Sequence, residues 1–265
     1  MIIDFKGKTA IVAGSTSGIG LAIAQGLAAA GARVVVTGRT QASVDQAVQQ
    51  VNAGQPAHPT VGVAADLATP QGGQALIAAH PDADILVNSL GIYEAKPLLE
   101  LEDADWNRVF DVNVLSAARL SSHYAKGMKQ RGWGRLIFVS SESAVNIPTE
   151  MVHYGVSKAA LQALARGYAK ELAATGVTAN SILPGPTATA NVSAFLEPMA
   201  AERGISVDEM SARFIQEKRP ASLLRRFAQP EEVASLAVYV ASEQASATTG
   251  AALRVEGGIV ETPFA

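Results

Sequence analysis

Short runs rich in β-branched residues alternate with longer, alanine-rich segments along most of this chain. The runs predict strands at residues 9–13, 33–37, 60–64, 84–88, 135–140 and 177–183, with a last strand near Leu253. The segments between them predict helices at residues 18–30, 41–52, 103–129 and 152–174, and near Glu231. Strands joined through helical crossovers run parallel. The alternation therefore predicts an α/β fold in three layers, with a doubly wound parallel sheet of about seven strands and helices on both faces.

The length and composition favour one domain. The chain has 265 residues, 48% of them apolar, and it contains no linker or internal repeat that would mark a boundary. Residues 1–265 are therefore predicted to form a single unit. The alternation stops at Pro184, and residues 187–220 form a mixed segment that carries Phe195, Met199 and Phe214. This segment, which also contains Met210, is either a substrate lid or an ordinary packed helical excursion.

Composition also disfavours several classes of function. A formal net charge of −3 provides no attraction for nucleic acid or an anionic membrane, so we expect a small-molecule partner. The chain has no cysteine, and its four histidines lack metal-ligand spacing, so no metal site is predicted. Residues 9–32 are uncharged and long enough to cross a bilayer, but their glycines fit a strand, a turn and a helix better. No secretory signal is visible at the N-terminus, so a cytoplasmic location is expected.

A glycine-rich turn follows the first predicted strand. It consists of Gly14, Ser15, Thr16, Ser17, Gly18, Ile19 and Gly20. Glycines at such a turn let the backbone approach a pyrophosphate at the N-terminus of the next helix. The spacing is G-x-x-x-G-x-G, and tight packing alone is the alternative explanation. We interpret the turn as a dinucleotide-binding element.

The second predicted strand ends in Gly38 and Arg39, where an NAD site usually has an acidic residue. The Arg39 guanidinium can bind a 2′-phosphate, so NADP(H) is favoured over NAD(H). The alternative is a solvated arginine at a strand end. Asp66, followed by Leu67, is predicted to lie beside the adenine, although an aspartate here is equally common as a loop or cap residue.

Tyr154 and Lys158 lie four residues apart on a predicted helix, so their side chains share one face. A phenol with a pKa of about 10 is a poor acid or base at neutral pH, and a neighbouring ammonium favours its phenolate. The pair therefore fits acid/base chemistry. Alone, such a pair is more often a solvated feature of a helix surface.

The glycine turn, Asn88, Asn113, Ser141 and the Tyr154/Lys158 pair occur together in this order. In this combination the chain resembles the short-chain dehydrogenase/reductase superfamily in its single-domain Rossmann form, from Lys8 through Gly258. The resemblance extends to 3-oxoacyl-[acyl-carrier-protein] reductases.

The resemblance implies a role for each catalytic residue. Tyr154 would be the general acid in reduction and the general base in oxidation, and Lys158 would lower its pKa and hold the nicotinamide ribose. Ser141 would position the substrate carbonyl, with Ser140 and Ser143 as less favoured substitutes. Asn113 would kink its helix and hold a proton-relay water. The resemblance further assigns cofactor contacts to Asn88, Gly91, Tyr154, Lys158, Pro184, Gly185, Thr187 and Thr189.

One stretch departs from the family pattern. After Asn88 the chain has Ser89 and Leu90 where relatives carry smaller or amide residues, which alters the pocket beside the adenosine ribose. The C-terminal stretch 255–259 is close to the pattern that lies near a subunit contact in related proteins. A homotetramer or homodimer is therefore expected.

The most favoured function is an NADP(H)-dependent oxidoreductase that transfers a hydride between nicotinamide and a carbonyl or secondary alcohol. One alternative is an NADP-binding sensor without turnover, and another is an epimerase or dehydratase of the same superfamily. A 3-oxoacyl thioester substrate is an alternative because Lys129 and Arg131 stand near where such reductases carry a basic docking patch. However, Thr175 replaces a second arginine there, and Lys129 and Arg131 are equally typical of a solvated helix end.

Overall fold

The computed structural model describes residues 2–263 and contains a seven-stranded parallel sheet. The strands are β1 (Thr9–Ala13), β2 (Arg33–Gly38), β3 (Val61–Ala64), β4 (Ile85–Asn88), β5 (Gly134–Val139), β6 (Val177–Pro184) and β7 (Ala252–Val255). Their order is β3-β2-β1-β4-β5-β6-β7, so the direction of winding reverses between β1 and β4. The predicted doubly wound sheet is confirmed, and each predicted strand agrees with the structure to within a residue or so.

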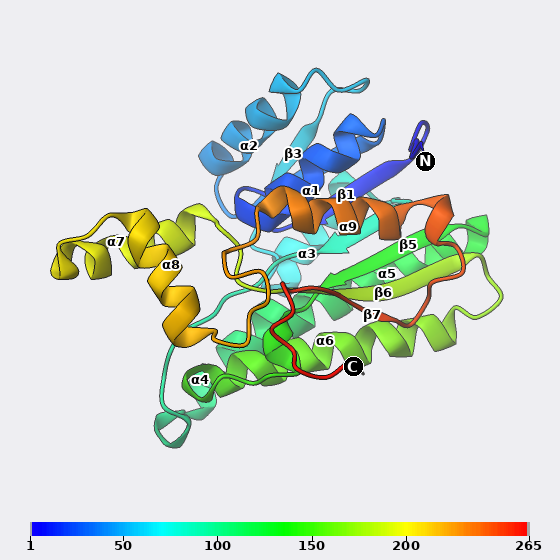
Figure 1. The fold of residues 1–265 in the computed structure, drawn as a ribbon. Helices are drawn as coiled ribbons and strands as arrows, with labels where there is room; N and C mark the ends of the chain where they lie inside the picture. The colour runs from blue at the N-terminus through cyan, green and yellow to red at the C-terminus, as the bar shows by residue number, and fades with distance from the viewer. Residues whose placement is uncertain (1, 264–265) are drawn as a thin grey trace.

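Helices cover both faces of the sheet (Figure 1). They are α1 (Gly18–Ala29), α2 (Gln41–Ala53), α3 (Pro70–Ala79), α4 (Asp103–Phe110), α5 (Ser116–Arg131), α6 (Val152–Glu171), α7 (Ala190–Arg203), α8 (Val207–Lys218) and α9 (Pro230–Ala241). Helices α1, α2 and α9 pack on one face, and α3, α5 and α6 pack on the other. This is the predicted three-layer arrangement.

Alternating strand residues divide the core into two hydrophobic clusters. On β1, Ala10 and Val12 face the α1/α9 layer, whereas Ile11 faces the α5/α6 layer. All three are fully buried. Successive side chains of a strand point to opposite faces, so a sheet covered on both sides needs an apolar residue at every position. The uncharged stretch at residues 9–32 is thereby explained as a buried strand, a turn and a helix.

Two helix predictions were incomplete. Helix α3 was not predicted, because its sequence carries Gly72 and Gly73 and shows little periodicity. The predicted helix at residues 103–129 is interrupted by a π-helical segment, Asp111–Leu115, between α4 and α5. Asn113 lies in this segment, at the place where the family resemblance implies a kink.

Helices α7 and α8 extend away from the three layers, at the left of Figure 1. They have a small core of their own, formed by Leu196, Ala200, Met210, Ile215 and Phe227. Met199 and Phe214 pack against this core while remaining partly accessible, and Phe195 is 54% exposed. The excursion therefore has one face that is packed and another that is open to its surroundings.

Candidate active site

Two cavities meet at the carboxyl ends of the strands, where ligands of doubly wound sheets bind. The glycine-turn cavity has a volume of about 630 Å³ and is lined by the β1 turn and the ends of β4, β5 and β6. The α7–α8 cavity has a volume of about 1210 Å³ and lies between the β5 end and helices α7 and α8. Both cavities are lined by Tyr93, Ser141, Tyr154, Gly185 and Val192. These residues form the wall between the two.

The glycine turn depends on a missing side chain at two positions. Gly14 has φ +74°, and a Cβ atom there would lie 2.8 Å from the Cα atom of Leu90. A Cβ atom on Gly20 would lie 2.1 Å from the carbonyl oxygen of Gly14. Only glycine satisfies such contacts, because a real Cβ would force the backbones apart. The turn can therefore pass close to the end of β4.

Buried hydroxyls fix the shape of this turn. Ser15 Oγ donates to the carbonyl of Val12 at 2.7 Å and accepts from Thr37 N at 2.9 Å. Thr37 Oγ1 accepts from Gly14 N at 3.0 Å. Ser15 therefore acts from beneath the turn and does not line the cavity. These hydrogen bonds hold the turn against β2 without the help of a ligand.

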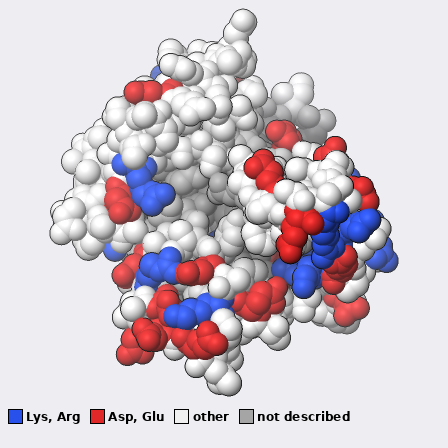
Figure 2. All heavy atoms as spheres, turned by 90° about the vertical axis from the view of Figure 1, so that its left-hand side faces the viewer, with Lys and Arg blue, Asp and Glu red and all other residues white. Residues whose placement is uncertain are grey.

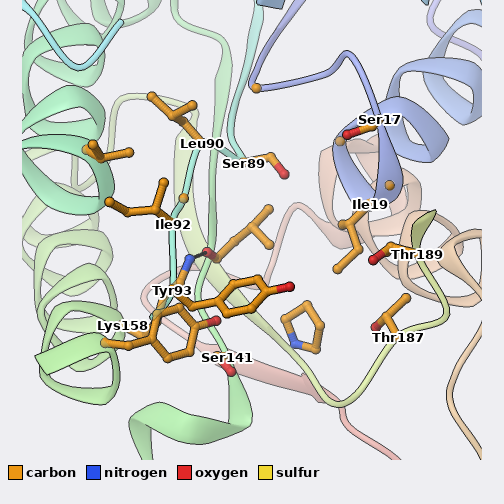
Figure 3. Close-up of a pocket in the computed structure, with 18 of the residues that line it drawn as sticks. Ser17, Ile19, Ser89, Leu90, Ile92, Tyr93, Ser141, Lys158, Thr187 and Thr189 are labelled. Carbon is orange, nitrogen blue, oxygen red and sulfur yellow. Dashed lines mark hydrogen bonds between the residues drawn. The ribbon is translucent and has the colours of Figure 1, made fainter. Parts of the chain in front are cut away.

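The N-terminus of α1 opens into the glycine-turn cavity. Its first turn contains no acidic residue, and Ser17 makes no side-chain capping bond. The unpaired N–H groups and the positive end of the helix dipole at such a terminus favour an anion. In Figure 3, Ser17 and Ile19 face the cavity from this side, with Thr187 and Thr189 below them. This cradle fits a pyrophosphate.

Arg39 and Asp66 also line this cavity. Arg39 is exposed, and no residue within 2–263 forms a hydrogen bond or ion pair with its guanidinium. Asp66 Oδ1 accepts from Ala68 N at 3.2 Å, which is the cap-like contact that the sequence left open. Its other oxygen remains available at the cavity wall.

Tyr154 and Lys158 project from α6 toward the wall between the cavities. Lys158 is buried, and its Nζ donates to the carbonyl of Val139 at 2.9 Å. Ser140 Oγ donates to the carbonyl of Lys158 at 2.7 Å. These contacts join α6 to the end of β5, so the position of the ammonium is set by two elements. Figure 3 shows Lys158 and Ser141 on the same side of the cavity.

Asn113 stands behind this group. Its Oδ1 accepts from Ile92 N at 2.8 Å, and its Nδ2 donates to the Ile92 carbonyl at 3.0 Å and to Ser157 Oγ at 2.9 Å. A Cβ atom on Gly91 would lie 3.1 Å from Lys158 Nζ. The π-helical segment thus presents one amide to the β4 end and to α6 together.

The sequence matches the family model described as enoyl-(acyl carrier protein) reductase over residues 13–260. The chain belongs to the short-chain dehydrogenase/reductase superfamily. It is accordingly an oxidoreductase that uses a nicotinamide dinucleotide.

Among curated relatives, the uncharacterized oxidoreductase YvaG of Bacillus subtilis strain 168 is 39% identical over 264 residues, which is 100% of both chains. The D-beta-hydroxybutyrate dehydrogenase of Cupriavidus necator is 35% identical, covering 96% of this chain and 98% of the relative. Among solved structures, L-sorbose reductase from Gluconobacter frateurii, complexed with NADPH and L-sorbose, has a TM-score of 0.93. Its sequence identity is 32%, covering 99% of this chain and 100% of that chain.

In this short-chain dehydrogenase/reductase the pKa of Tyr154 is not lowered, as the sequence led us to expect, but raised. Burial raises the pKa of Tyr154 to about 12, although a hydrogen bond with Ser141 acts in the opposite direction. Burial also lowers the pKa of Lys158 to about 8. Lys158 Nζ lies 5.6 Å from the centroid of the Tyr154 ring. The chain's own groups therefore do not produce the lowered tyrosine pKa that the sequence led us to expect, because desolvation outweighs the hydrogen bond with Ser141.

Most of the predicted site residues line the glycine-turn cavity of this enzyme. They are Gly14, Thr16, Ser17, Gly18, Ile19, Gly20, Arg39, Asp66, Gly91, Ser141, Tyr154, Lys158, Pro184, Gly185, Thr187 and Thr189. Ser15, Leu67, Asn88 and Asn113 are buried behind it. The Leu67 side chain belongs to the α5/α6 core, and its carbonyl accepts from Arg119 Nη1 at 3.0 Å. Asn88 Nδ2 donates to Ser121 Oγ at 3.1 Å.

Tyr93 is a pocket residue that sequence reasoning missed. Its ring meets the Tyr154 ring edge-on, with centroids 6.1 Å apart, and it is 52% exposed. Figure 3 shows Tyr93 projecting into the cavity from the segment after β4. Its place two residues after Gly91, at the carboxyl end of a strand, was the available signal.

The described residues contain no group of three or more His, Asp or Glu that could hold a metal ion. Nor does any described helix have the length and apolarity needed to span a bilayer.

Proposed function

We propose that the enzyme catalyses the reversible interconversion of a carbonyl and a secondary alcohol, with NADP(H) as the preferred cofactor. The cofactor, when bound, supplies or accepts the hydride. Its pyrophosphate is assigned to the α1 N-terminus and its nicotinamide ribose to Lys158 and Tyr154. The observation that carries the proposal is the meeting of the two cavities at Tyr154 and Ser141. One ligand in each cavity would place its reacting end at these two hydroxyls.

The chain's own groups divide the remaining chemistry. In reduction, Ser141 Oγ donates a hydrogen bond to the substrate carbonyl, and Tyr154 delivers a proton to the same oxygen. Lys158 keeps a cation beside the phenol, because a pKa of about 8 leaves it mostly protonated at pH 7. Asn113 positions the Ile92 backbone and α6 through its hydrogen bonds. The tyrosine pKa falls only if a bound positive charge offsets the burial.

The preference for NADP rests on Arg39. It lies at the end of β2, is exposed, and borders the cavity beside Gly38. No carboxylate occupies the β2 end to bind a ribose 2′-hydroxyl. A guanidinium binds a phosphate through charge-assisted hydrogen bonds. This arrangement supports NADP(H) over NAD(H).

We also propose that helices α7 and α8 form the substrate lid within a single-domain enzyme. Val192, Phe195 and Met199 line the α7–α8 cavity from the lid side. The excursion has its own small core, so it can shift as a unit while retaining internal packing. We propose further that the chain associates as a homodimer or homotetramer, in which an interface would cover the 98% exposed side chain of Leu99.

The structure gives little support to carrier-protein docking. Lys129 Nζ lies 3.3 Å from Glu171 Oε1, and Arg131 Nη1 lies 2.7 Å from Asp82 Oδ1. Both cations are therefore partly neutralised within the chain. A non-catalytic NADP sensor is also disfavoured. Such a protein would not need the acid/base groups of Ser141, Tyr154, Lys158 and Asn113.

The proposal is tested by NADPH consumption across ketones, diketones, keto sugars, steroids and β-ketoacyl thioesters, with NADH in parallel. Tyr154→Phe, which removes only the hydroxyl, is the matched variant. We expect it to lose about 10²-fold to 10⁴-fold in kcat while still binding NADPH through the remaining cofactor contacts. Near-normal turnover by Tyr154→Phe would overturn the assignment. NADPH binding by the wild type without turnover of any substrate would favour the sensor.

A further inference from the structure

The α7–α8 cavity has an acidic lining. Its charged residues are Glu94, Glu142, Glu150, Glu217, Glu261, Lys218 and Arg219. Figure 2 shows charged side chains gathered around the hollow on the face that carries α7 and α8. The glutamates outnumber the cations, so a ligand here meets more negative than positive charge. The same cavity is also lined by apolar residues, among them Ile147, Leu196, Met199, Phe214 and Phe227.

The glutamates differ in their cationic partners and in their burial. Glu94 and Glu217 are paired from outside this cavity by Arg108 and Arg203. Glu142 is the buried one, with a side chain only 6% exposed. It directly follows Ser141 and lies in the short turn Glu142–Ala144 at the end of β5. A carboxylate is therefore held beside the reaction centre and away from water.

Arg219 is the cation nearest to Glu142. Its Nε lies 3.7 Å from Glu142 Oε1, and its Nη1 lies 3.9 Å from Glu150 Oε1. Both separations exceed a hydrogen bond. Nη1 donates instead to the Lys218 carbonyl at 2.8 Å. The guanidinium thus lies between two carboxylates with most of its N–H donors still available.

The protonation of Glu142 reflects the same surroundings. Burial raises its pKa, and the carboxylates of Glu256 and Glu150 act in the same direction. The Arg219 guanidinium and a hydrogen bond from Ser143 oppose the rise without cancelling it. A substrate that brings another carboxylate would add to the repulsion that already exists here.

We propose that Glu142 and Arg219 select a neutral, polyhydroxylated ketone or alcohol, with Glu142 accepting hydrogen bonds from substrate hydroxyls next to the reacting carbon. This rests on the proposed oxidoreductase function. A hydroxyl both donates and accepts, so it satisfies the carboxylate and the guanidinium together. A carboxylate substrate offers only acceptors, and a simple aliphatic ketone offers Glu142 no hydrogen-bond donor. The apolar residues of the lining would contact the C–H groups of the same molecule.

Matched six-carbon ketones test this selection. L-sorbose and D-fructose are neutral, and 5-keto-D-gluconate and 2-keto-D-gluconate are the same molecules with one terminal CH₂OH oxidised to a carboxylate. The compound 2-hexanone has the length without the hydroxyls. We expect kcat/KM with NADPH to be at least about tenfold higher for a neutral sugar than for its acid or for 2-hexanone. A wild type that prefers a keto acid or 2-hexanone would overturn the inference.

Two variants separate recognition from a structural role. Glu142→Gln keeps the shape and removes the charge, so we expect it to reduce the sugar-to-acid ratio of kcat/KM by about fivefold or more. Glu142→Ala should lower kcat/KM for the sugar more than for 2-hexanone, whereas a merely structural defect would lower both equally. The control is Glu202→Gln, an exposed glutamate of α7 outside the cavity, which should leave both ratios unchanged. An unchanged ratio in Glu142→Gln would contradict the inference.

The failures of the two proposals are distinguishable. If the wild type reduces none of these six-carbon ketones, the inference about hydroxyl recognition is wrong. The oxidoreductase proposal would still be judged by the wider panel and by Tyr154→Phe. Turnover of β-ketoacyl thioesters alone would retain the chemistry and reject the polyol assignment.

Discussion

The two cavities that meet at Tyr154 are built in different ways. The glycine-turn cavity is shaped by backbone, by missing side chains at Gly14 and Gly20, and by buried hydroxyls such as Ser15. The α7–α8 cavity is shaped by charged and aromatic side chains from segments far apart in sequence. A backbone-built site accepts one kind of ligand whatever the neighbouring residues are. A site built from side chains can change its ligand with a few substitutions.

The largest effect is expected at the wall that the cavities share. Replacing Lys158 with Met retains the length of the side chain and removes the ammonium that donates to Val139. We expect kcat to fall by about 10²-fold to 10⁴-fold, because the phenol loses its cation. Thermal unfolding should show that the fold persists. A wild-type kcat in Lys158→Met would mean that the wall contributes no acid/base chemistry and that the two cavities are functionally separate.

A substitution in the turn tests whether the first cavity is truly backbone-built. Gly14→Ala places a methyl group 2.8 Å from Leu90 Cα at a positive φ, whereas Gly7→Ala has a similar φ of +83° and no atom within 4 Å. We expect Gly7→Ala to cost about 1 kcal/mol of unfolding free energy and Gly14→Ala about 2–4 kcal/mol. Gly14→Ala should also weaken NADPH binding at least about tenfold, measured by fluorescence titration. Equal effects of the two variants would show that only the positive φ matters.

The pH dependence of stability provides a smaller test of the burial at the wall. Lys158 has a pKa of about 8 when folded and an ordinary value of 10.5, so the unfolded chain binds more protons between these values. Stability should therefore rise with pH across that range, by about 2 kcal/mol from pH 7.5 to 9.5. The opposite effect of Tyr154, with a pKa of about 12 against 10.0, becomes appreciable only as the pH approaches 10.

The control for this prediction is Lys158→Met, which should lack the rise. The measurement is denaturant unfolding of both proteins in matched buffers. A rise of the same size in the variant would assign it to other groups.

The smallest effect concerns Arg39, the exception within the backbone-built cavity. Arg39→Ser should raise the Kd for NADPH about tenfold, which corresponds to about 1.4 kcal/mol of binding free energy. It should leave the Kd for NADH unchanged. The reason is that only NADPH carries the 2′-phosphate that a guanidinium can bind. Equal losses for both nucleotides would indicate that Arg39 has a structural role at the end of β2.

The sequence was sufficient where local pattern decides the structure. The strands follow from apolar runs, and the Tyr154/Lys158 pair follows from helical spacing, so both could be predicted. Helix α3 was missed because Gly72 and Gly73 obscure its pattern, although Thr69 and Pro70 at its start were usable signals. The approach of Arg219 to Glu142 could not be predicted, because it depends on how α8 packs over the β5 end. The raised pKa of Tyr154 likewise depends on burial, which residue spacing does not reveal.

The π-helical segment at Asp111–Leu115 has a consequence for protein engineering. A π-helical turn contains one residue more than the regular helix around it needs, and such turns are rare outside functional sites. Deleting one residue there would restore a regular helical ladder between α4 and α5. It would also rotate Asn113 away from Ile92 and Ser157. Selection for turnover would therefore retain a residue that a regular helix does not need.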